Sequence, residues 1–266
     1  MKLYVKGYSS YKGDMANFDV KQELKKKYQL DTRRQDTFIH YAVYGAQLLK
    51  EHIKVDPSDE LYITSGVGNI DILQKTKQYV EKEGQFIKPF DFINILGNTT
   101  SYYVATSLGL KGKNSFQISD NFTFINTLMS IYASLCISGK DAILGSIDFV
   151  STPDEVLKRV LELEKDSQVT SGVNYQKFSL TKENAIAAIE LDPKTYSFDE
   201  IKSFIEKSEM NVMVSPRAQN FEQTGNVEYF ETIGSWFVNK ALENQEELIY
   251  IDCYDKYYKM IKVLQV

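Results

Sequence analysis

The feature that most constrains this sequence is a long apolar segment near its centre, Phe122–Ile137 (FTFINTLMSIYASLCI). Hydrophobic residues fall on nearly every face of a helix drawn through it, so we expect a helix buried all round. Gly139 is the expected C-terminal stop. Such a helix needs packed layers around it, and 266 residues of which 43% are hydrophobic can supply them.

Strand-like and helix-like segments alternate on both sides of this central helix. Strands are predicted at Met1–Lys6, Glu60–Ser65, Ser115–Ser119, Asp141–Val150, Ala185–Leu191 and in a closing hairpin of Leu248–Tyr254 and Tyr257–Leu264. Helices are predicted at Thr37–Ile53, Asp71–Glu83, Asn98–Leu108 (capped by Asn98 or Thr99), Thr152–Lys165, Ser197–Lys207 and Gly234–Glu243. The pattern predicts an α/β protein with mixed sheets and a buried central helix.

Composition excludes several classes of function. A net charge of -5 argues against nucleic acid and against an anionic membrane surface. There is no apolar run of about 18 residues and no signal-like start, so we expect a cytoplasmic protein.

Cys136 and Cys253 lie in apolar stretches and are expected to be buried free thiols. His40 and His52 are the only histidines; we expect surface or interface positions for them, with no metal site and no cofactor. Gly66 and Gly68 follow a strand, but a third glycine is missing, which argues against a nucleotide-binding loop.

Six landmarks occur along the chain in one order. They are Leu61–Gly68 (LYITSGVG), Pro89–Asn98 (PFDFINILGN) with Ala105–Gly112 (ATSLGLKG), Ser115–Asn121, Gly139–Asp148 (GKDAILGSID), Lys182–Leu191 (KENAIAAIEL) and Gln223–Leu242. Together they resemble the β-ketoacyl synthase family, which has the thiolase fold. The resemblance implies one thiolase-like domain, 1–266, with an N-terminal half 1–175 and a reduced C-terminal half 176–266. The missing length falls mainly between Leu191 and Val214.

The departures from the family pattern concern its catalytic residues. The resemblance places the nucleophilic cysteine at Asn121 or Phe122, and neither residue can accept an acyl group. A histidine follows a Thr-Gly pair in the family, whereas Asn226 follows Thr224-Gly225 here. The family's lysine falls at Phe221, and no histidine occurs after His52. The resemblance therefore implies a synthase-like chain that has lost its catalytic groups.

Family members are dimers in which the strand before the nucleophile pairs with its copy. The resemblance implies that this chain pairs with an active ketosynthase, as chain length factors do. Its interface residues would be Phe90, Phe92, Tyr102, Tyr103, Phe116 and Ile118. The alternative is that these side chains fill the core. Arg33 and Arg34 are candidate contacts for an acidic acyl carrier protein, a second expected partner.

Other interpretations remain open at this point. Asn121 is read either as the cap of the central helix or as a hydrogen-bonding group for a carrier-bound malonyl unit. The leading function is a non-catalytic subunit in fatty acid, polyketide or polyene biosynthesis. One alternative is a homodimeric acyl-binding protein. Another is an acyltransferase that uses a different nucleophile, with Ser119, Asp120 and Thr123 flanking the position.

Overall fold

The chain folds as two repeats of one strand–helix pattern. The computed structural model describes residues 1–12, 17–119, 121–149, 168–218, 221 and 228–266. The first repeat consists of β1 (Lys2–Tyr11), α2 (Thr37–His52), β2 (Glu60–Ser65), α5 (Gly97–Leu108), β3 (Asn114–Ile118), α6 (Thr123–Ser138), β4 (Ala142–Asp148) and β6 (Gly172–Ser179). The second consists of β7 (Ala187–Leu191), α8 (Phe198–Glu206), β8 (Asn211–Val214), α9 (Ile233–Asn244), β10 (Leu248–Tyr254) and β11 (Tyr257–Gln265).

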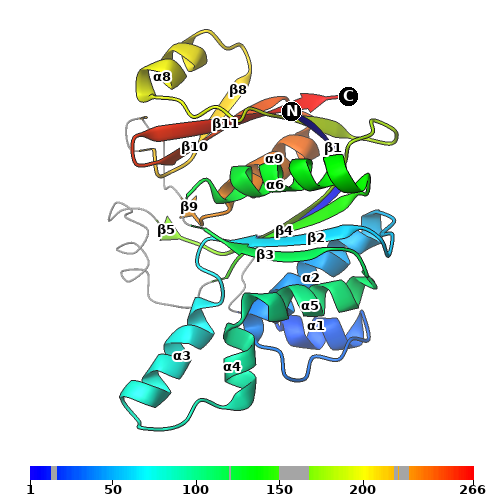
Figure 1. Ribbon diagram of the computed structural model, residues 1–266, viewed down its shortest axis with the longest axis vertical. Helices are drawn as coiled ribbons and strands as arrows, with labels where there is room; N and C mark the ends of the chain where they lie inside the picture. Colours follow the sequence, from blue (N-terminus) through cyan, green and yellow to red (C-terminus); the bar gives the residue numbers. More distant parts are fainter. Residues whose placement is uncertain (13–16, 120, 150–167, 219–220, 222–227) are drawn as a thin grey trace.

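Shorter elements are added to these repeats. They are α1 (Val20–Lys26), α3 (Ile70–Glu81), α4 (Pro89–Ile95) and a small parallel pair of strands, β5 (Gln168–Val169) and β9 (Glu228–Tyr229). Helices α3 and α4 project from the body of the molecule below the central sheet (Figure 1). The boundary predicted at residue 175 falls within β6, and the repeat pattern changes between β6 and β7.

A nine-stranded mixed sheet, in the order β3-β2-β4-β6-β1-β7-β11-β10-β8, contains the strands of both repeats. The start of β1 pairs with β7 and its remainder with β6, which joins the repeats. Strand order in the second repeat, β8-β10-β11-β7, matches the first except that no described strand corresponds to β3. The chain spans 66–122 between β2 and α6 but only 215–232 between β8 and α9. The second repeat is therefore the shorter one, as predicted.

Helices α6 and α9 lie side by side between the sheet strands of the two repeats, while α2, α5 and α1 cover the outer face of the first (Figure 1). Buried Phe124 and Leu128 of α6 share one hydrophobic cluster with Val238 of α9 and Tyr250 of β10. The sandwiched position of α6 confirms the predicted central helix. The expectation that it is buried all round is wrong, because its last turn extends past the sheets: Ile137 is 90% exposed.

Cys136 follows the same pattern. It lies on the last turn of α6 and is exposed, so the prediction that it is buried is wrong. Cys253 is buried in β10, and both thiols are free. His40 is buried in α2 rather than at a surface, and its ring Nε2 lies 3.2 Å from the Thr32 carbonyl oxygen. Burial lowers the pKa of His40, which keeps the ring neutral.

A polar row crosses the inner face of the first repeat, where a purely apolar surface would be expected. Its members are direct cross-strand neighbours, one on each strand: Gln117, Thr64, Ser146, Asn174 and Ser10. Thr127 of α6 lies 3.1 Å from the Thr64 hydroxyl oxygen, and Asn239 of α9 donates to the Ser10 hydroxyl at 2.8 Å. The row therefore sets the position of both inner helices along the sheet.

Most predicted elements are present within one or two residues of the expected bounds. Strand β1 is the main exception, since it runs on to Tyr11. The capping prediction for α5 is wrong: its N-cap is Leu96, and neither Asn98 nor Thr99 caps it with a side chain. Strand β6 was not predicted at all. The helix predicted over 152–165 lies outside the described residues.

A buried ion pair at the end of the sheet opposite the α6 N-terminus generates a stability prediction. Lys177 Nζ lies 2.7 Å from Asp59 Oδ2, and both side chains are buried. Asp59→Ala leaves a buried ammonium with the more distant Asp141 and the Lys54 carbonyl oxygen, and we expect it to lower the free energy of unfolding by about 3 kcal/mol. Glu190→Ala breaks an exposed pair with Lys2, and we expect a loss of less than about 1 kcal/mol. Urea denaturation of both variants measures the difference, and equal losses would contradict this account.

Candidate functional site

The turn from β3 into α6 holds an unusual backbone conformation at Phe122. This residue is the N-cap of α6 and adopts the left-handed region, with φ 47° and ψ 35°. A bulky residue in that region is strained, and such strain collects at functional turns. A sharp strand-to-helix turn of this kind is also how some hydrolases present a nucleophile. Here the turn presents an aromatic ring, packed edge-on against Tyr254 with Lys259 Nζ 5.3 Å above it.

Asn121 does not cap α6. Its side-chain Oδ1 accepts a hydrogen bond from the Ser119 hydroxyl at 3.0 Å, and its carbonyl oxygen accepts one from the Asn126 amide at 3.1 Å. The capping interpretation of Asn121 is therefore wrong, because the side chain bonds backward to the end of β3 and not to the helix N–H groups. The N-cap residue of α6, Phe122, provides no side-chain cap.

Asp148, at the end of β4, joins the two repeats beneath this turn. Its Oδ1 accepts hydrogen bonds from the Ser65 hydroxyl and the Gly66 N–H, both at 2.9 Å. Its Oδ2 accepts from the N–H and the hydroxyl of Thr232, the N-cap residue of α9, both at 2.8 Å. Burial raises the pKa of this carboxyl, while these bonds oppose the rise.

Glu231 lies beside the start of α6, and the sequence did not single it out. Its Oε1 lies 3.2 Å from the Thr123 hydroxyl oxygen, and its Oε2 accepts hydrogen bonds from Arg217 at 3.1 Å and from the Tyr229 hydroxyl. The carboxyl is only 5% exposed, and burial raises its pKa to about 8, more than Arg217 lowers it. The signal in the sequence was Glu231–Gly234 (ETIG), which leads directly into α9.

The charges around Glu231 explain why it holds a proton. Asp252 of β10 is also buried, and burial raises its pKa to about 6. One guanidinium, Arg217, faces Glu231 and Asp252 in this region, with Asp148 nearby as a third carboxyl. Lys259 also lies near Asp252, and burial outweighs the effect of Arg217 on Glu231, so the Glu231 carboxyl keeps its proton near neutral pH. Chemically, Glu231 is a buried acid held against the start of α6.

Phe221, the predicted lysine position, is not part of this turn. Phe221 packs its ring against Phe198 of α8 and Tyr258 of β11, with centroids 5.3 and 5.9 Å away. Asn226 and Asp120 lie outside the described residues, so the prediction for Asn226 stays a prediction. Among the described residues, no group of His, Cys, Asp and Glu side chains could hold a metal ion.

The predicted interface residues lie on β3 and on helices α4 and α5. Among the described strands, β3 hydrogen-bonds only to β2, at one end of the sheet order. Ile118 at its end is 57% exposed, Phe92 of α4 is 55% exposed and Tyr102 of α5 is 59% exposed. Phe90 is exposed as well, while Tyr103 and Phe116 are half-buried. The core-filling alternative is therefore wrong for Phe90, Phe92, Tyr102 and Ile118, which leave apolar surface in solvent.

Arg33 and Arg34 lie together on the rim of a cavity of about 350 Å³ between the loop before α2 and α5. Tyr102 and Tyr103 line the same cavity, so two separately predicted groups of residues meet there. The two arginines differ in their contacts: Arg33 forms hydrogen bonds to both carboxylate oxygens of Asp31, whereas Arg34 lies over the Phe90 ring.

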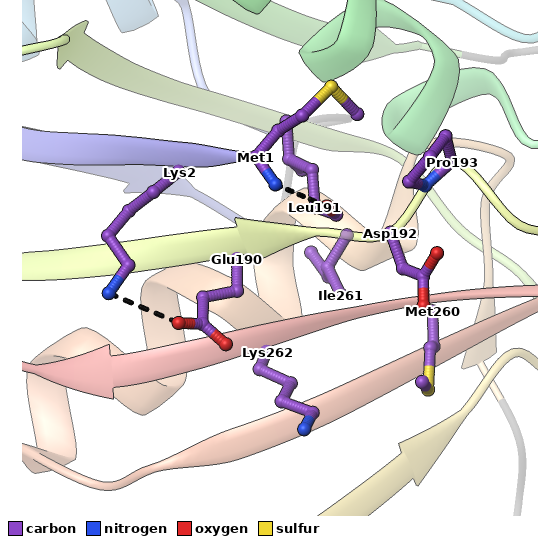
Figure 2. A pocket seen from close by; sticks show the side chains of 9 residues that line it. All are labelled: Met1, Lys2, Glu190, Leu191, Asp192, Pro193, Met260, Ile261 and Lys262. Carbon is purple, nitrogen blue, oxygen red and sulfur yellow. Dashed lines mark hydrogen bonds and ion pairs between the residues drawn. The ribbon is translucent and has the colours of Figure 1, made fainter.

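A larger cavity, of about 480 Å³, is lined by the start of β1, by the end of β7 with the loop after it, and by β11 (Figure 2). It forms where β1, β7 and β11 run side by side without a covering helix. Lys2 pairs with Glu190 across it at 3.1 Å, and Lys262 is the neighbour of Glu190 on β11. These exposed charges compensate one another, so we assign no site here.

Comparisons with known proteins identify the fold. No protein-family model matches the chain, and no curated protein matches it in sequence. The ishigamide ketosynthase/chain length factor superimposes with a TM-score of 0.72 over 100% of this chain and 99% of that one, at 11% identity. A β-ketoacyl synthase from Burkholderia phymatum gives 0.65 over 100% and 99%, at 8% identity. A ketosynthase in complex with its chain length factor from Xenorhabdus doucetiae gives 0.62 over 98% and 99%, at 11% identity. The chain therefore has the thiolase-like fold of ketosynthases and chain length factors, as the sequence predicted.

Within the described residues, no helix is long and apolar enough to cross a membrane.

The raised pKa of Glu231 predicts a specific pH dependence. Unfolded glutamate loses its proton near pH 4.5, whereas Glu231 keeps it to about pH 8. Its stabilising contribution is complete below pH 4.5 and decreases as pH rises to 8, by about 1.4 kcal/mol per pH unit. We expect Glu231→Gln to flatten the decrease in unfolding free energy between pH 6.5 and 8.

The matched control is Glu200→Gln on α8. A hydrogen bond from Lys194 helps to lower the pKa of Glu200 to about 2, so this group does not titrate in the same window. Urea denaturation at several pH values should show an unchanged slope for Glu200→Gln. An unchanged slope for Glu231→Gln as well would mean that Glu231 is ionised at neutral pH.

Proposed function

We propose that this chain is a non-catalytic, chain-length-factor-like subunit that pairs with an active ketosynthase in the cytoplasm. The observation that carries the proposal is Phe122, which stands in the strained turn where a ketosynthase of this fold would present its nucleophile. The chain keeps the geometry of that turn without a group able to accept an acyl chain. A role beside a catalytic partner fits this combination, in fatty acid, polyketide or polyene biosynthesis.

The loss of catalytic groups extends beyond the nucleophile. Glu231 lies near the α6 N-terminus, just before α9, whereas the resemblance places a family histidine earlier in the chain, at Asn226. A protonated carboxyl held by Arg217, Tyr229 and Thr123 cannot replace imidazole as an acceptor of protons near pH 7. Removing several members of a catalytic group leaves little residual chemistry.

The surface around β3 supports pairing. A free strand edge with exposed apolar side chains on both sides is the kind of surface that proteins cover with a partner. Two of the structural neighbours are described as a ketosynthase with its chain length factor. We therefore place the ketosynthase against β3, α4 and α5, with its own edge strand beside β3.

The alternative of another nucleophile finds little support in the site. The Thr123 side chain is buried, and its hydroxyl donates to the Ser119 carbonyl oxygen. The Ser119 hydroxyl is hydrogen-bonded to Asn121 and has no base next to it among the described residues. A homodimeric acyl-binding protein would use the same apolar surface, so oligomeric state decides between that role and ours.

The proposed function predicts that the chain assembles with the synthase. Co-expressed with the ketosynthase encoded nearest to its gene, the chain should elute as a one-to-one complex in size-exclusion chromatography with mass determination. Ile118→Asp buries a charge in the interface, and we expect at least tenfold weaker binding. Ile137→Asp, at the far end of α6, is the control that leaves binding unchanged. A stable homodimer that ignores the synthase would contradict the proposal.

The proposed function also predicts that Phe122, and not Asn121, occupies the position of the nucleophile. In a Cys136→Ser background, Phe122→Cys puts a thiol at the α6 N-terminus, which lowers thiol pKa values. We expect this thiol to react with iodoacetamide at neutral pH faster than that of Asn121→Cys. The Cys136→Ser parent should not be labelled by a reactive acyl thioester; labelling of that parent would support the acyltransferase alternative. A faster Asn121→Cys thiol would move the nucleophile position to Asn121.

A further inference from the structure

Arg34 is an exposed cation that the described part of the chain leaves without an acidic partner. No carboxylate among the described residues lies within ion-pair distance of its guanidinium, whereas neighbouring Arg33 is paired with Asp31 at 2.6 Å. The guanidinium of Arg34 lies instead over the Phe90 ring, 4.9 Å from its centroid. A cation held on an aromatic face keeps its edge N–H groups free for a planar anion.

The backbone fixes Arg34 in this place. Its φ is 65°, in the left-handed region that residues with long side chains rarely adopt. On one side the side chain meets the cavity of about 350 Å³ that Tyr102 and Tyr103 line. On the other it meets Phe90 of α4. A strained residue at a cavity is an observation from which a binding role can be inferred.

Phe90 and Tyr102 connect this position with the surface around β3. Both are among the exposed apolar residues on which we place the ketosynthase. Interfaces place apolar residues at the centre and charged, hydrogen-bonded pairs at the rim. Arg34 stands at the border of the apolar surface, where a partner that covers Phe90 must come within reach of the guanidinium.

We infer that Arg34 is the receptor for an acidic side chain of the partner ketosynthase, which enters the cavity beside Tyr102 and Tyr103. This rests on the proposed function and adds a named contact to it. The carboxylate accepts two hydrogen bonds from the guanidinium, and Phe90 and Tyr102 shield the pair from water. The two arginines differ in their availability to a partner, because Arg33 already binds Asp31 and contributes no free charge.

The test compares matched variants in complex with the synthase encoded nearest to the gene. Arg34→Asn removes the charge but tolerates the left-handed backbone, so the isolated chain should keep its melting temperature. We expect its Kd for the synthase, measured by surface plasmon resonance, to rise about tenfold. Arg33→Asn, which loses only a local pair, should stay within about twofold of the wild-type Kd. Rising salt should weaken the wild-type complex more than the Arg34→Asn complex.

The outcomes separate this inference from the function on which it rests. Equal Kd values for the wild type and Arg34→Asn in a complex that forms would overturn the inference and leave the proposed function intact. Absence of any complex with the wild-type chain would overturn both. If Arg34→Asn binds the synthase normally but loses binding of the acyl carrier protein, the acidic group belongs to the carrier and the inference is wrong.

Discussion

The four hydrogen bonds of Asp148 are the interaction on which the arrangement of the two repeats depends. One carboxylate oxygen takes its donors from the end of β2, and the other takes both donors from the N-cap residue of α9. A buried carboxylate is tolerated only when it is well supplied with donors, so neither repeat can shift without leaving it unsatisfied. The contact fixes where α9 begins and thereby where α6, packed beside it, enters the sandwich.

Phe122 holds a strained backbone conformation at the N-terminus of α6. A left-handed residue that is not glycine costs about 1–3 kcal/mol, and the surroundings must offset that cost. Burial of the ring against Tyr254 offsets it here, because the aromatic side chain fills the space above the turn. The turn directs α6 between the two repeats, which is a structural role that requires no nucleophile.

Periodicity predicted the elements whose two faces differ in the ordinary way, such as α3 and α8. It missed β6, where Val173 and Tyr175 face α2 while Asn174 and Gln176 face the inner helices. These two amides interrupt the apolar pattern of a wholly buried strand. Asn174 belongs to the polar row, and the Gln176 side chain donates hydrogen bonds to Ser235 and Asn239 of α9. The resemblance predicted the fold, while its placement of the family nucleophile at Asn121 or Phe122 stays a prediction. It could not reveal Glu231, whose significance depends on Thr123 and Arg217, both distant in the sequence.

The central claim is that a ketosynthase covers the free edge of β3, and hydrogen exchange of the β3 backbone amides tests it most directly. In the isolated chain, the N–H groups of Asn114–Ile118 that do not bond to β2 should exchange quickly, because they face solvent. In the presence of the synthase, the account predicts that these amides become protected while those of the distant edge strand β8 remain unchanged. A bound synthase that leaves β3 exchanging at its free rate would contradict it.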